Sequence, residues 1–334
     1  MSLRLVVTGF GRAGEAHARY YRTVPDVEVV GVADRAPARR AAAAALFPAA
    51  AVAERLTDLA VRADLLIVAT PPHSHAEDIR WGIDAGMHVV CEKPAVLDAG
   101  VGAELAAHAA AVPVVLYPNH NYVFAPFARR FEELLSAGRC GVPRHMEIDV
   151  ERPGAADGVD AWKPSWRTDA VIAGGGVLVD HGAHCVYLAE IFMRAPVVSV
   201  SCTATRPERG GVDHDVDLHL LFEGGGTGRV RLSWTGTARR NRYLVRGGRG
   251  TLTAADGAVV VRDGSGEQRW AVADPAVGHH AHEDWLPELF ADVRRRIARP
   301  RASARGPWHS AVMVARVVTA AYASAEAAGA WTAV

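Results

Sequence analysis

The chain has 334 residues, of which half are apolar and 22% are charged, a composition typical of a globular protein. Lys and Arg together number 37 and so do Asp and Glu, so the basic excess that marks most nucleic-acid binders is absent. The length favours two domains, each large enough for its own core.

The spacing of the cysteines and the length of the apolar runs indicate the cellular compartment of the protein. The four cysteines, Cys91, Cys140, Cys185 and Cys202, form no C-x-x-C pair, which disfavours a zinc ribbon and favours a reducing compartment. No apolar run reaches the roughly 18 residues of a membrane span. The first apolar run stops at Gly9, too early for a signal peptide. We therefore expect a cytoplasmic protein that binds neither nucleic acid nor membrane.

The first 120 residues alternate short apolar runs with helical stretches. Helices are expected up to about Arg22, over 36–47 and after Ser74, which could serve as an N-cap. The apolar runs that predict buried strands are 3–8, 27–34, 65–70, 87–92 and 112–117. Strands that alternate with helices indicate βαβ units and a parallel sheet.

Beyond about residue 120 the pattern changes. From residue 144 onward polar and apolar residues alternate and glycine-rich turns separate several segments, which predicts antiparallel hairpins. Helices are expected at 126–136, 177–193, 283–298 and 309–327. The predicted fold is α/β plus α+β: a Rossmann domain over 1–120, then an α+β domain over 121–334 built on an open, mainly antiparallel sheet.

A glycine motif follows the first predicted strand. Gly9, Gly11 and Gly14 in "GFGRAG" have the G-x-G-x-x-G spacing that allows a tight turn, close approach of a pyrophosphate, and close packing of helix on strand. Asp34 lies 20 residues past Gly14, where a carboxylate would bind the adenosine ribose and favour NAD. Arg35 beside it could pair with a 2′-phosphate, so use of NADP stays open.

Four motifs, "GFGRAG", "ATPPHSH", "CEKP" and "GGGVLVDHGAH", occur in a specific order and spacing. In these motifs the chain resembles the glucose–fructose oxidoreductase/inositol dehydrogenase/MocA-like (Gfo/Idh/MocA) family over essentially its whole length. The resemblance implies an NAD(P)-dependent oxidoreductase acting on the secondary alcohol or ketone of a sugar, sugar derivative or cyclitol. Besides the residues above, it implies these cofactor contacts: Arg12, Ala13, Thr70, Pro71, His75, Glu92, Lys93 and Asn121. For His75, helix capping is an equal alternative.

Lys93 is one of only two lysines in the chain. It stands at the carboxyl end of a predicted parallel strand, the edge at which doubly wound sheets bind ligands. A compact ammonium with rotatable donors suits a hydroxyl or carbonyl oxygen better than a planar guanidinium does. The resemblance implies that Lys93 is catalytic, that its bond to Pro94 is often cis, and that Glu92 positions the loop or the lysine.

Asp180 and His184 are four residues apart, so on a helix they share one face. An imidazole near a carboxylate is a good general base, and an ordinary helical contact is the alternative. The resemblance implies that His184 takes the substrate hydroxyl proton, Lys93 orients the oxygen, and Asp180 binds a neighbouring hydroxyl. His181 points about 100° away and is expected to be structural. The glycines at 174–176 would let this helix start close to another backbone or to the nicotinamide.

The substrate side carries weaker signals. Tyr122 and Trp166 would suit stacking on a sugar or cyclitol ring, and Arg167 and His282 are further candidates, although a packed surface loop explains Trp166 and Arg167 as well. The family's usual arginine is missing at Tyr122 and Val123, so we expect a neutral or cationic polyol rather than a carboxylate or phosphate ester. "HHAHED" (279–284) has metal-ligand residue types but irregular spacing, so no metal is expected.

Two other functions stay open. A dinucleotide-binding regulator without chemistry would need none of Lys93, Asp180 and His184. A lyase or hydrolase that retains NAD and oxidises its substrate transiently would use all three. Alternating strands at 216–222 and 229–234 leave one charged sheet face, which predicts a homodimer or homotetramer.

Overall fold

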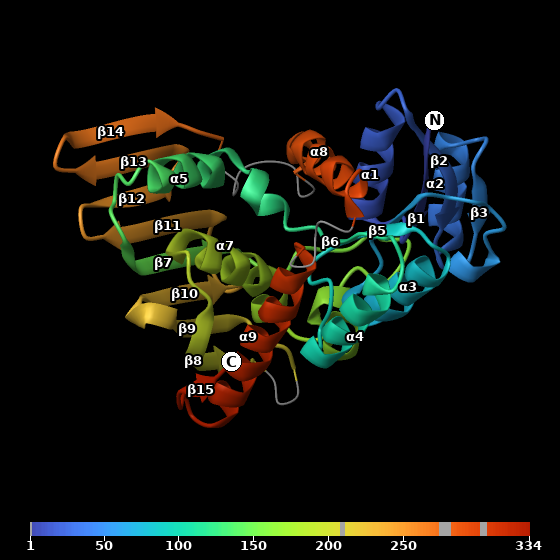
Figure 1. Cartoon of the computed structure of the whole chain (residues 1–334). Helices are drawn as coiled ribbons and strands as arrows, with labels where there is room; N and C mark the ends of the chain where they lie inside the picture. Colours follow the sequence, from blue (N-terminus) through green and yellow to red (C-terminus); the bar gives the residue numbers. More distant parts are fainter. Residues whose placement is uncertain (1, 208–210, 274–281, 301–305) are drawn as a thin grey trace.

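The computed structural model describes residues 2–207, 211–273, 282–300 and 306–334. Its first part is a six-stranded parallel sheet in the order β3-β2-β1-β4-β5-β6 (Figure 1). The strands are β1 (Leu3–Thr8), β2 (Val27–Ala33), β3 (Ala51–Ala53), β4 (Leu65–Val68), β5 (His88–Cys91) and β6 (Leu116–Pro118). The order reverses between β1 and β4, and such a switch point is where doubly wound sheets bind ligands.

Helices cover both faces of this sheet, so its central strands are apolar throughout: all four residues of β4 are buried. Side chains of α1 and α2 pack on one face, and those of α3 and α4 pack on the other. The helices are α1 (Arg12–Arg22), α2 (Pro37–Leu46), α3 (Pro72–Asp84) and α4 (Ala99–Ala110). The Rossmann prediction is therefore confirmed.

Several local details differ from the sequence-based expectation. Strand β3 and helix α4 were not anticipated, because three residues show no period and α4 is rich in alanine and glycine. Ser74 does not cap α3, which begins at Pro72 with Pro71 at the N-cap position, since proline suits the first helical residue. The strand expected over 112–117 begins only at Leu116, after a turn.

The second part is a nine-stranded sheet in the order β14-β13-β12-β11-β7-β10-β9-β8-β15. All of its pairings are antiparallel except that of β7 with β10, which is parallel. The prediction of a mainly antiparallel sheet is therefore confirmed. The strands are β7 (Pro143–Glu151), β8 (Val197–Thr205), β9 (Asp215–Phe222), β10 (Thr227–Ser233), β11 (Arg240–Gly247), β12 (Gly250–Ala255), β13 (Ala258–Asp263), β14 (Gly266–Ala271) and β15 (Thr332–Ala333).

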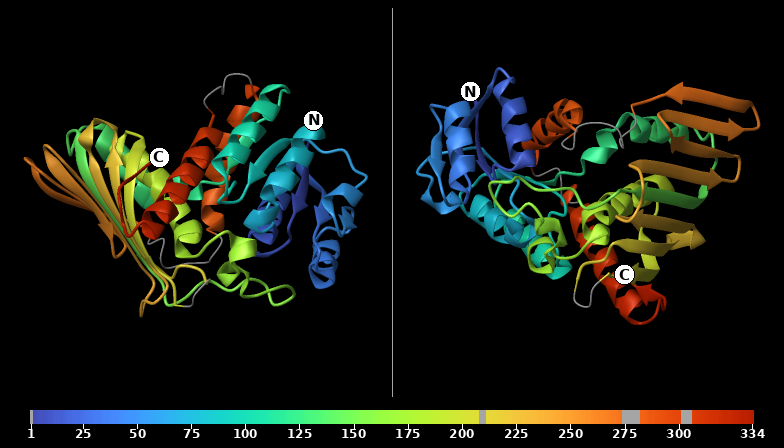
Figure 2. Two further views of the ribbon diagram at one scale, coloured as in Figure 1. Left: turned by 90° about the horizontal axis from the view of Figure 1, so that it is seen from below. Right: turned by 180° about the vertical axis from the view of Figure 1, so that it is seen from behind.

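The two faces of this sheet differ. Helices α5 (Pro126–Ser136), α7 (Ala183–Met193) and the second half of α9 (Trp308–Glu326) pack on one face (Figure 2, left). Residues at alternate positions, such as Leu218 and Leu220, are buried there because side chains alternate between faces along a strand. The opposite face carries ion pairs between neighbouring strands: Arg229–Asp217, Arg231–Asp149 and Arg242–Glu147.

The C-terminal helices connect the two parts. Phe290 and other apolar residues of α8 (Leu286–Ile297) pack into the first sheet's core, where the Phe290 ring lies 4.8 Å from that of Tyr21. The start of α9 also belongs to that domain, because Trp308 is buried there and its Nε1 donates to Gly102 O at 2.9 Å. The domain boundary at residue 120 stays a prediction, and the chain returns to the first domain near its end.

One stretch, Ala170–Met193, is long and apolar enough to cross a membrane by length and composition. It contains α6 (Ala170–Ala173), a π-helical turn (Leu178–Gly182) and α7. Two thirds of its most apolar window (67%) is buried inside the fold, where Val186 and Leu188 belong to the second domain's core. Burial against the sheet accounts for its apolar character.

Candidate functional site

A cleft opens at the carboxyl ends of β1, β2 and β4. Most of the expected cofactor residues line it: Gly9, Gly11, Arg12, Ala13, Asp34, Arg35, Thr70 and Pro71. Gly9 has φ +81°, and a Cβ there would lie 2.5 Å from the Thr70 nitrogen. A Cβ on Gly14 would lie 1.9 Å from Gly9 O, so this glycine sets the close contact of α1 with β1.

Gly11 differs from the other two glycines, because a Cβ there would meet no protein atom within 4 Å. It begins α1 as the N-cap residue, without a side-chain cap. Open space beside the positive end of a helix fits a pyrophosphate. The residues present therefore fit a dinucleotide at this position, with the phosphates over Gly11 and the N-terminus of α1.

Asp34 is held in place by backbone amides. Its Oδ2 accepts a hydrogen bond from Phe10 N at 2.6 Å, and its Oδ1 accepts one from Ala36 N at 2.8 Å. The carboxylate is thus fixed at the end of β2, on the wall of the cleft, where a ribose would lie. Arg35 and Arg55 line the same wall, so positive charge is also present there.

The cleft continues into a second pocket, which shares Ala13, Thr70 and Trp166 with the first. The Lys93–Pro94 peptide bond at its edge is cis. Lys93 Nζ donates to Asp180 Oδ1 at 2.6 Å and to Asp180 O at 2.8 Å. Burial alone would raise the pKa of Asp180, but the adjacent Lys93 ammonium and His181 outweigh it and hold this pKa well below its usual range.

Glu92 lies beneath Lys93 and is fixed from two sides. Its Oε1 is 3.2 Å from His17 Nε2 and accepts a hydrogen bond from Asn119 Nδ2 at 2.5 Å. Both partners are only 2% exposed. His17 lies on α1 and Asn119 follows β6, so the sheet topology brings together residues that no motif connects. The sequence signals did not single out either of them.

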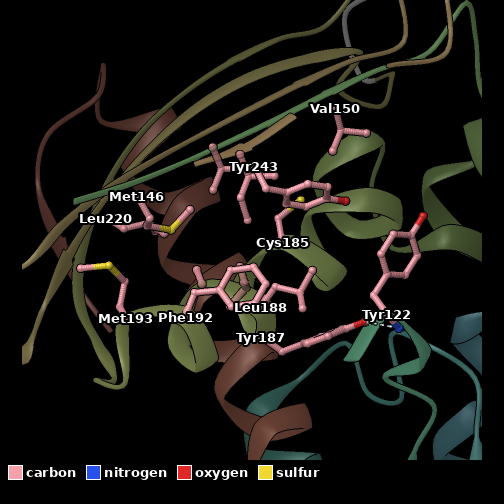
Figure 3. Packing of buried hydrophobic residues seen from close by; sticks show 14 of the residues in the cluster. Tyr122, Met146, Val150, Cys185, Tyr187, Leu188, Phe192, Met193, Leu220 and Tyr243 are labelled. Carbon is pink, nitrogen blue, oxygen red and sulfur yellow. Dashed lines mark hydrogen bonds between the residues drawn. The ribbon is translucent and has the colours of Figure 1, made fainter. Parts of the chain in front are cut away.

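His184 has a different partner from the expected one. Its Nδ1 lies 3.0 Å from the hydroxyl of Tyr187, which also accepts a hydrogen bond from Tyr122 N at 3.1 Å (Figure 3). Asp180 is held by Lys93 instead. Burial lowers the pKa of His184 well below its usual value, and the Lys93 charge acts in the same direction. The imidazole is therefore neutral at neutral pH.

His181 differs from its expectation, and the glycine triplet lies close to another backbone, as expected. His181 Nδ1 lies 3.2 Å from Asp180 Oδ2, so this histidine contacts the Asp180 carboxylate, and the π-helical turn departs from the 100° step on which the structural role was based. A Cβ on Gly176 would lie 1.9 Å from Asp213 O. The close backbone expected beside the triplet is thus that of Asp213, while Gly175 of the same triplet lines the second pocket.

Asp213 anchors the start of the helical segment that carries Asp180 and His184, and the sequence signals did not single it out. It is 1% exposed, and its carboxylate accepts hydrogen bonds from Gly176 N at 2.9 Å and Leu178 N at 2.8 Å. The Tyr322 hydroxyl donates to the same carboxylate at 2.6 Å. An aspartate at a helix start is a common cap, but this one comes from the β8–β9 connection, so spacing along the chain gives no signal.

The loop after β7, residues 153–168, lies over both pockets. Arg12 Nη2 donates to Gly158 O at 3.3 Å, which links the glycine motif to this loop. Trp166 and Arg167 line both pockets, with the Arg167 guanidinium 4.3 Å from the Trp166 ring and its Nε 3.8 Å from Asp180 Oδ2. These two residues are thus at the junction of the two pockets.

Four further expected residues line neither pocket, and the same holds for Gly14 and His184. His75 is 1% exposed, with Nδ1 2.9 Å from Pro94 O and Nε2 2.6 Å from Thr70 O, so it supports both loops from inside rather than facing a ligand or capping a helix. Tyr122 is buried with its ring 4.3 Å from that of His184, which leaves little free face for stacking on a sugar. His282 stacks on Trp285 at 3.9 Å. Asn121 starts a short 3-10 turn and lines neither pocket.

Within the described ranges, no group of three or more His, Cys, Asp or Glu residues could hold a metal ion. His279 and His280 of "HHAHED" lie outside the described residues.

Comparison with known proteins gives two family models that together match most of the chain. Residues 3–120 match "Oxidoreductase family, NAD-binding Rossmann fold", and residues 128–253 match "GFO/IDH/MocA C-terminal domain". Among solved structures, GenD2 from gentamicin A biosynthesis in complex with NAD has a TM-score of 0.82 at 25% identity, covering 100% of this chain and 96% of that one. Levoglucosan dehydrogenase with NADH has a TM-score of 0.85 at 20% identity, which shows the fold alone.

Two curated relatives are 30% identical. D-glucoside 3-dehydrogenase of Escherichia coli (strain K12) matches over 199 residues, 59% of this chain and 55% of that protein. dTDP-3,4-didehydro-2,6-dideoxy-alpha-D-glucose 3-reductase of Saccharopolyspora spinosa matches over 233 residues, 69% of this chain and 67% of that protein. The match thus spans little more than half of the first relative. With both family models in place, the chain belongs to the Gfo/Idh/MocA family of oxidoreductases with an NAD-binding Rossmann domain.

Proposed function

We propose that this protein transfers a hydride between a nicotinamide and the secondary alcohol or ketone carbon of a sugar, a sugar derivative or a cyclitol. The observation that carries this proposal is the Lys93–Asp180 pair, 2.6 Å apart, placed where the dinucleotide cleft meets the second pocket. The names of the relatives support the substrate class, since they include glucoside, inositol and xylose dehydrogenases.

Bound NAD supplies the hydride acceptor, and the residues of the chain manage the proton and the charge. In oxidation, the C–H bond breaks with its electron pair leaving as hydride, the C=O bond forms, and the hydroxyl proton goes to His184. Nε2 of His184 receives it in the tautomer in which Nδ1–H donates to the Tyr187 oxygen, since Nε2 then carries the free lone pair. Lys93 donates a hydrogen bond to the substrate oxygen as negative charge develops there.

Asp180 sets the position of Lys93 and can accept a hydrogen bond from a neighbouring hydroxyl of the substrate. Its low pKa keeps it ionised, so it acts as an acceptor throughout. Glu92, fixed by His17 and Asn119, forms the base of the pocket. The loop over the cleft, with Trp166 and Arg167, limits the access of water to the nicotinamide.

The preferred cofactor in this proposal is NAD. Asp34 lies where the ribose 2′-oxygen would be and would repel a 2′-phosphate. Its fixed position, held by two backbone amides, means that it cannot turn away at low cost. Arg35 and Arg55 line the same cleft, and their positive charge would attract a 2′-phosphate. Some use of NADP is therefore the alternative result.

The proposal also covers assembly and compartment. The charged face of the nine-stranded sheet, with paired arginines and acids, is a self-complementary surface for a homodimer or homotetramer. All four cysteines are free and buried, which is typical of a cytoplasmic protein.

The test is a substrate panel assayed for NADH absorbance with D-glucosides, D-xylose, levoglucosan and inositols, each with NAD and with NADP. A parallel chromatographic assay follows cleavage or rearrangement of the substrate. Formation of NADH in step with a keto product supports the proposal. Cleavage of the substrate without net NADH would replace it with a lyase or hydrolase that retains NAD, and tight NAD binding without any turnover would favour a regulator.

A further inference from the structure

Arg152 directly follows β7 and is unusual among the arginines of the described chain. It is 3% exposed and continues the inward-facing series of Ile148 and Val150, so it points toward the catalytic helix and not toward the charged outer face. Its Nη1 donates to Glu151 O at 2.7 Å and to Arg240 O at 3.1 Å. Its Nε is buried without a hydrogen-bond partner.

Arg152 forms no ion pair with any carboxylate in the described ranges, although most arginines on this sheet do, as Arg229, Arg231, Arg240 and Arg242 illustrate. A buried guanidinium without a counter-charge is costly, because two carbonyl groups replace only part of the hydration that it loses. A charge retained in this position therefore indicates a role beyond stability.

Two neighbours of Arg152 also have buried polar atoms without a hydrogen-bond partner. Asn241 pairs in register with Val150, is 3% exposed, and has both amide atoms buried without a partner. Trp234 directly follows β10 and its buried Nε1 also lacks a partner. The adjacent strand connects the group, since Arg152 N donates to Ser233 O at 2.9 Å. Three adjacent strands thus place donors at one end of the inner face of the sheet.

This end of the sheet adjoins the catalytic residues on two sides. On one side, the Trp234 ring lies 6.5 Å from that of His181, whose Nδ1 is 3.2 Å from Asp180 Oδ2. On the other side is Tyr122, which contacts His184. Burial raises the pKa of Tyr122 to about 12, and the positive charge of Arg152 is the strongest influence in the opposite direction.

We propose that Arg152, assisted by Asn241, binds a carboxylate of the substrate, so that the substrate is a sugar acid or a carboxylated cyclitol. This inference rests on the proposed function and specifies the class of substrate. A guanidinium presents paired N–H donors whose geometry matches a carboxylate.

The inference replaces the expectation of a neutral or cationic substrate. That expectation relied on the electrostatic cost of an anion beside Asp180, on the absence of an arginine at Tyr122 and Val123, and on Tyr122 and Trp166 as stacking groups. In the structure Tyr122 is buried beside His184, and β7 brings an arginine to the same region from elsewhere in the chain. The carboxylate of the substrate would lie near Arg152, while its reacting hydroxyl lies near Lys93 and His184.

A purely structural role for Arg152 makes different predictions. Its two hydrogen bonds to carbonyl groups connect the ends of β7 and β11. If its role is structural, Arg152→Gln should lower the melting temperature and reduce the binding affinity of all substrates equally. Recognition of a carboxylate requires that the loss is confined to carboxylated compounds and that the affinity for NADH does not change.

The experiment measures binding by calorimetry to the full chain saturated with NADH, using the matched pairs D-glucuronate with D-glucose and D-galacturonate with D-galactose. We expect the wild type to bind at least one uronate about tenfold or more tightly than its neutral partner. Arg152→Gln should weaken uronate binding by about 10- to 100-fold and leave the neutral sugars unchanged, because a hydrogen bond to a charged group is lost. The uronate affinity of Arg152→Lys should lie between those of the wild type and Arg152→Gln.

Arg262→Gln is the matched control, because Arg262 lies on the same sheet but pairs with Glu267 near its far edge, and it should change nothing. Should Arg152→Gln fail to fold, Asn241→Asp supplies an internal carboxylate beside Arg152 and should remove the preference for uronates. Uronates that bind no better than their neutral partners, or equal losses for both classes, would overturn the inference. Turnover of neutral polyols with NAD would then still leave the proposed function intact.

Discussion

The dinucleotide cleft and the catalytic pocket are contiguous, but they are built in different ways. The cleft is made from backbone and from short segments that are close in the sequence: Gly9, Gly11 and the amides that hold Asp34. The catalytic pocket is made from side chains of separate elements, with Lys93 after β5 and Asp180 in the π-helical turn. One is a local motif, and the other exists only after the two domains have packed together.

The difference has an energetic consequence. In the cleft, the charge of Asp34 is satisfied by backbone groups that a point mutation leaves in place. In the catalytic pocket, the charge of each member depends on the others: Lys93 holds the pKa of Asp180 down and also lowers that of His184. We therefore expect substitutions in the cleft to have graded effects on activity that add independently. Substitutions in the pocket should have large effects that depend on one another.

The largest effect is expected from Lys93→Ala. Loss of the group that stabilises charge on the substrate oxygen should lower kcat by roughly 10²–10⁴-fold, while the dissociation constant of NADH stays nearly unchanged. Lys93→Arg should restore little activity, because a planar fork cannot replace a compact ammonium. Steady-state kinetics and calorimetry check both points, and a Lys93→Ala enzyme with near-wild-type kcat would contradict the assigned role.

Coupling within the pocket is tested by Asp180→Ala alone and together with Lys93→Ala. The single change should also lower kcat strongly, because Lys93 Nζ loses its 2.6 Å partner. The double variant should be only slightly slower than the slower single variant, since both act on one unit. Multiplicative losses, measured as kcat/KM in a double-mutant cycle, would show that the two residues work independently.

A smaller, graded change is expected in the cleft. Asp34→Ala should reduce the preference for NAD over NADP by about 10- to 100-fold, because it removes a charge that faces a 2′-phosphate and a hydrogen bond to the ribose. The kcat at saturating NAD should hardly change. The ratio of kcat/KM for the two cofactors is the measurement, and a wild-type enzyme that prefers NADP would show that Arg35 and Arg55 dominate.

The pH profile of oxidation tests the state of His184. Because burial and the Lys93 charge lower its pKa, the neutral base is present above that low value, and kcat should stay level as the pH falls through 6.5. Tyr187→Phe removes the partner of Nδ1 and should lower kcat about 2- to 10-fold. A rate that declines already between pH 7.5 and 6.5, with the protein still folded, would indicate that His184 is not the base or that its pKa is not depressed.

The smallest effect on catalysis is expected far from both sites. Arg231→Glu reverses one member of the charge pair with Asp149 on the outer face of the second sheet. It should weaken the proposed homo-oligomer in light scattering while kcat changes less than twofold. Wild-type protein that is monomeric at micromolar concentration would remove the proposed interface. Arg262→Glu, near the far edge of the sheet, serves as the control.

Some of the site could be predicted because its signals are local. The tight turn, the open space at Gly11 and the carboxylate at Asp34 all follow from spacing within about one βαβ unit. Lys93 stood out as one of two lysines, and Asp180 and His184 stood out by their spacing. His17, Asn119 and Asp213 gave no signal, because each acts on a residue that is distant in the chain.

The sequence by itself determined the parallel and antiparallel halves, the dinucleotide motif and the identity of the catalytic candidates, since alternation and glycine spacing act through local backbone geometry. Only the tertiary structure decided how these groups are paired. It gave Asp180 to Lys93, turned His75 and Tyr122 inward, and brought Arg152, which follows β7, to the inner face of the second sheet. The physical reason is that these contacts join different elements of the fold, and in the case of Lys93 and Asp180 the two domains, and the order of residues along a single strand or helix does not specify how such elements pack.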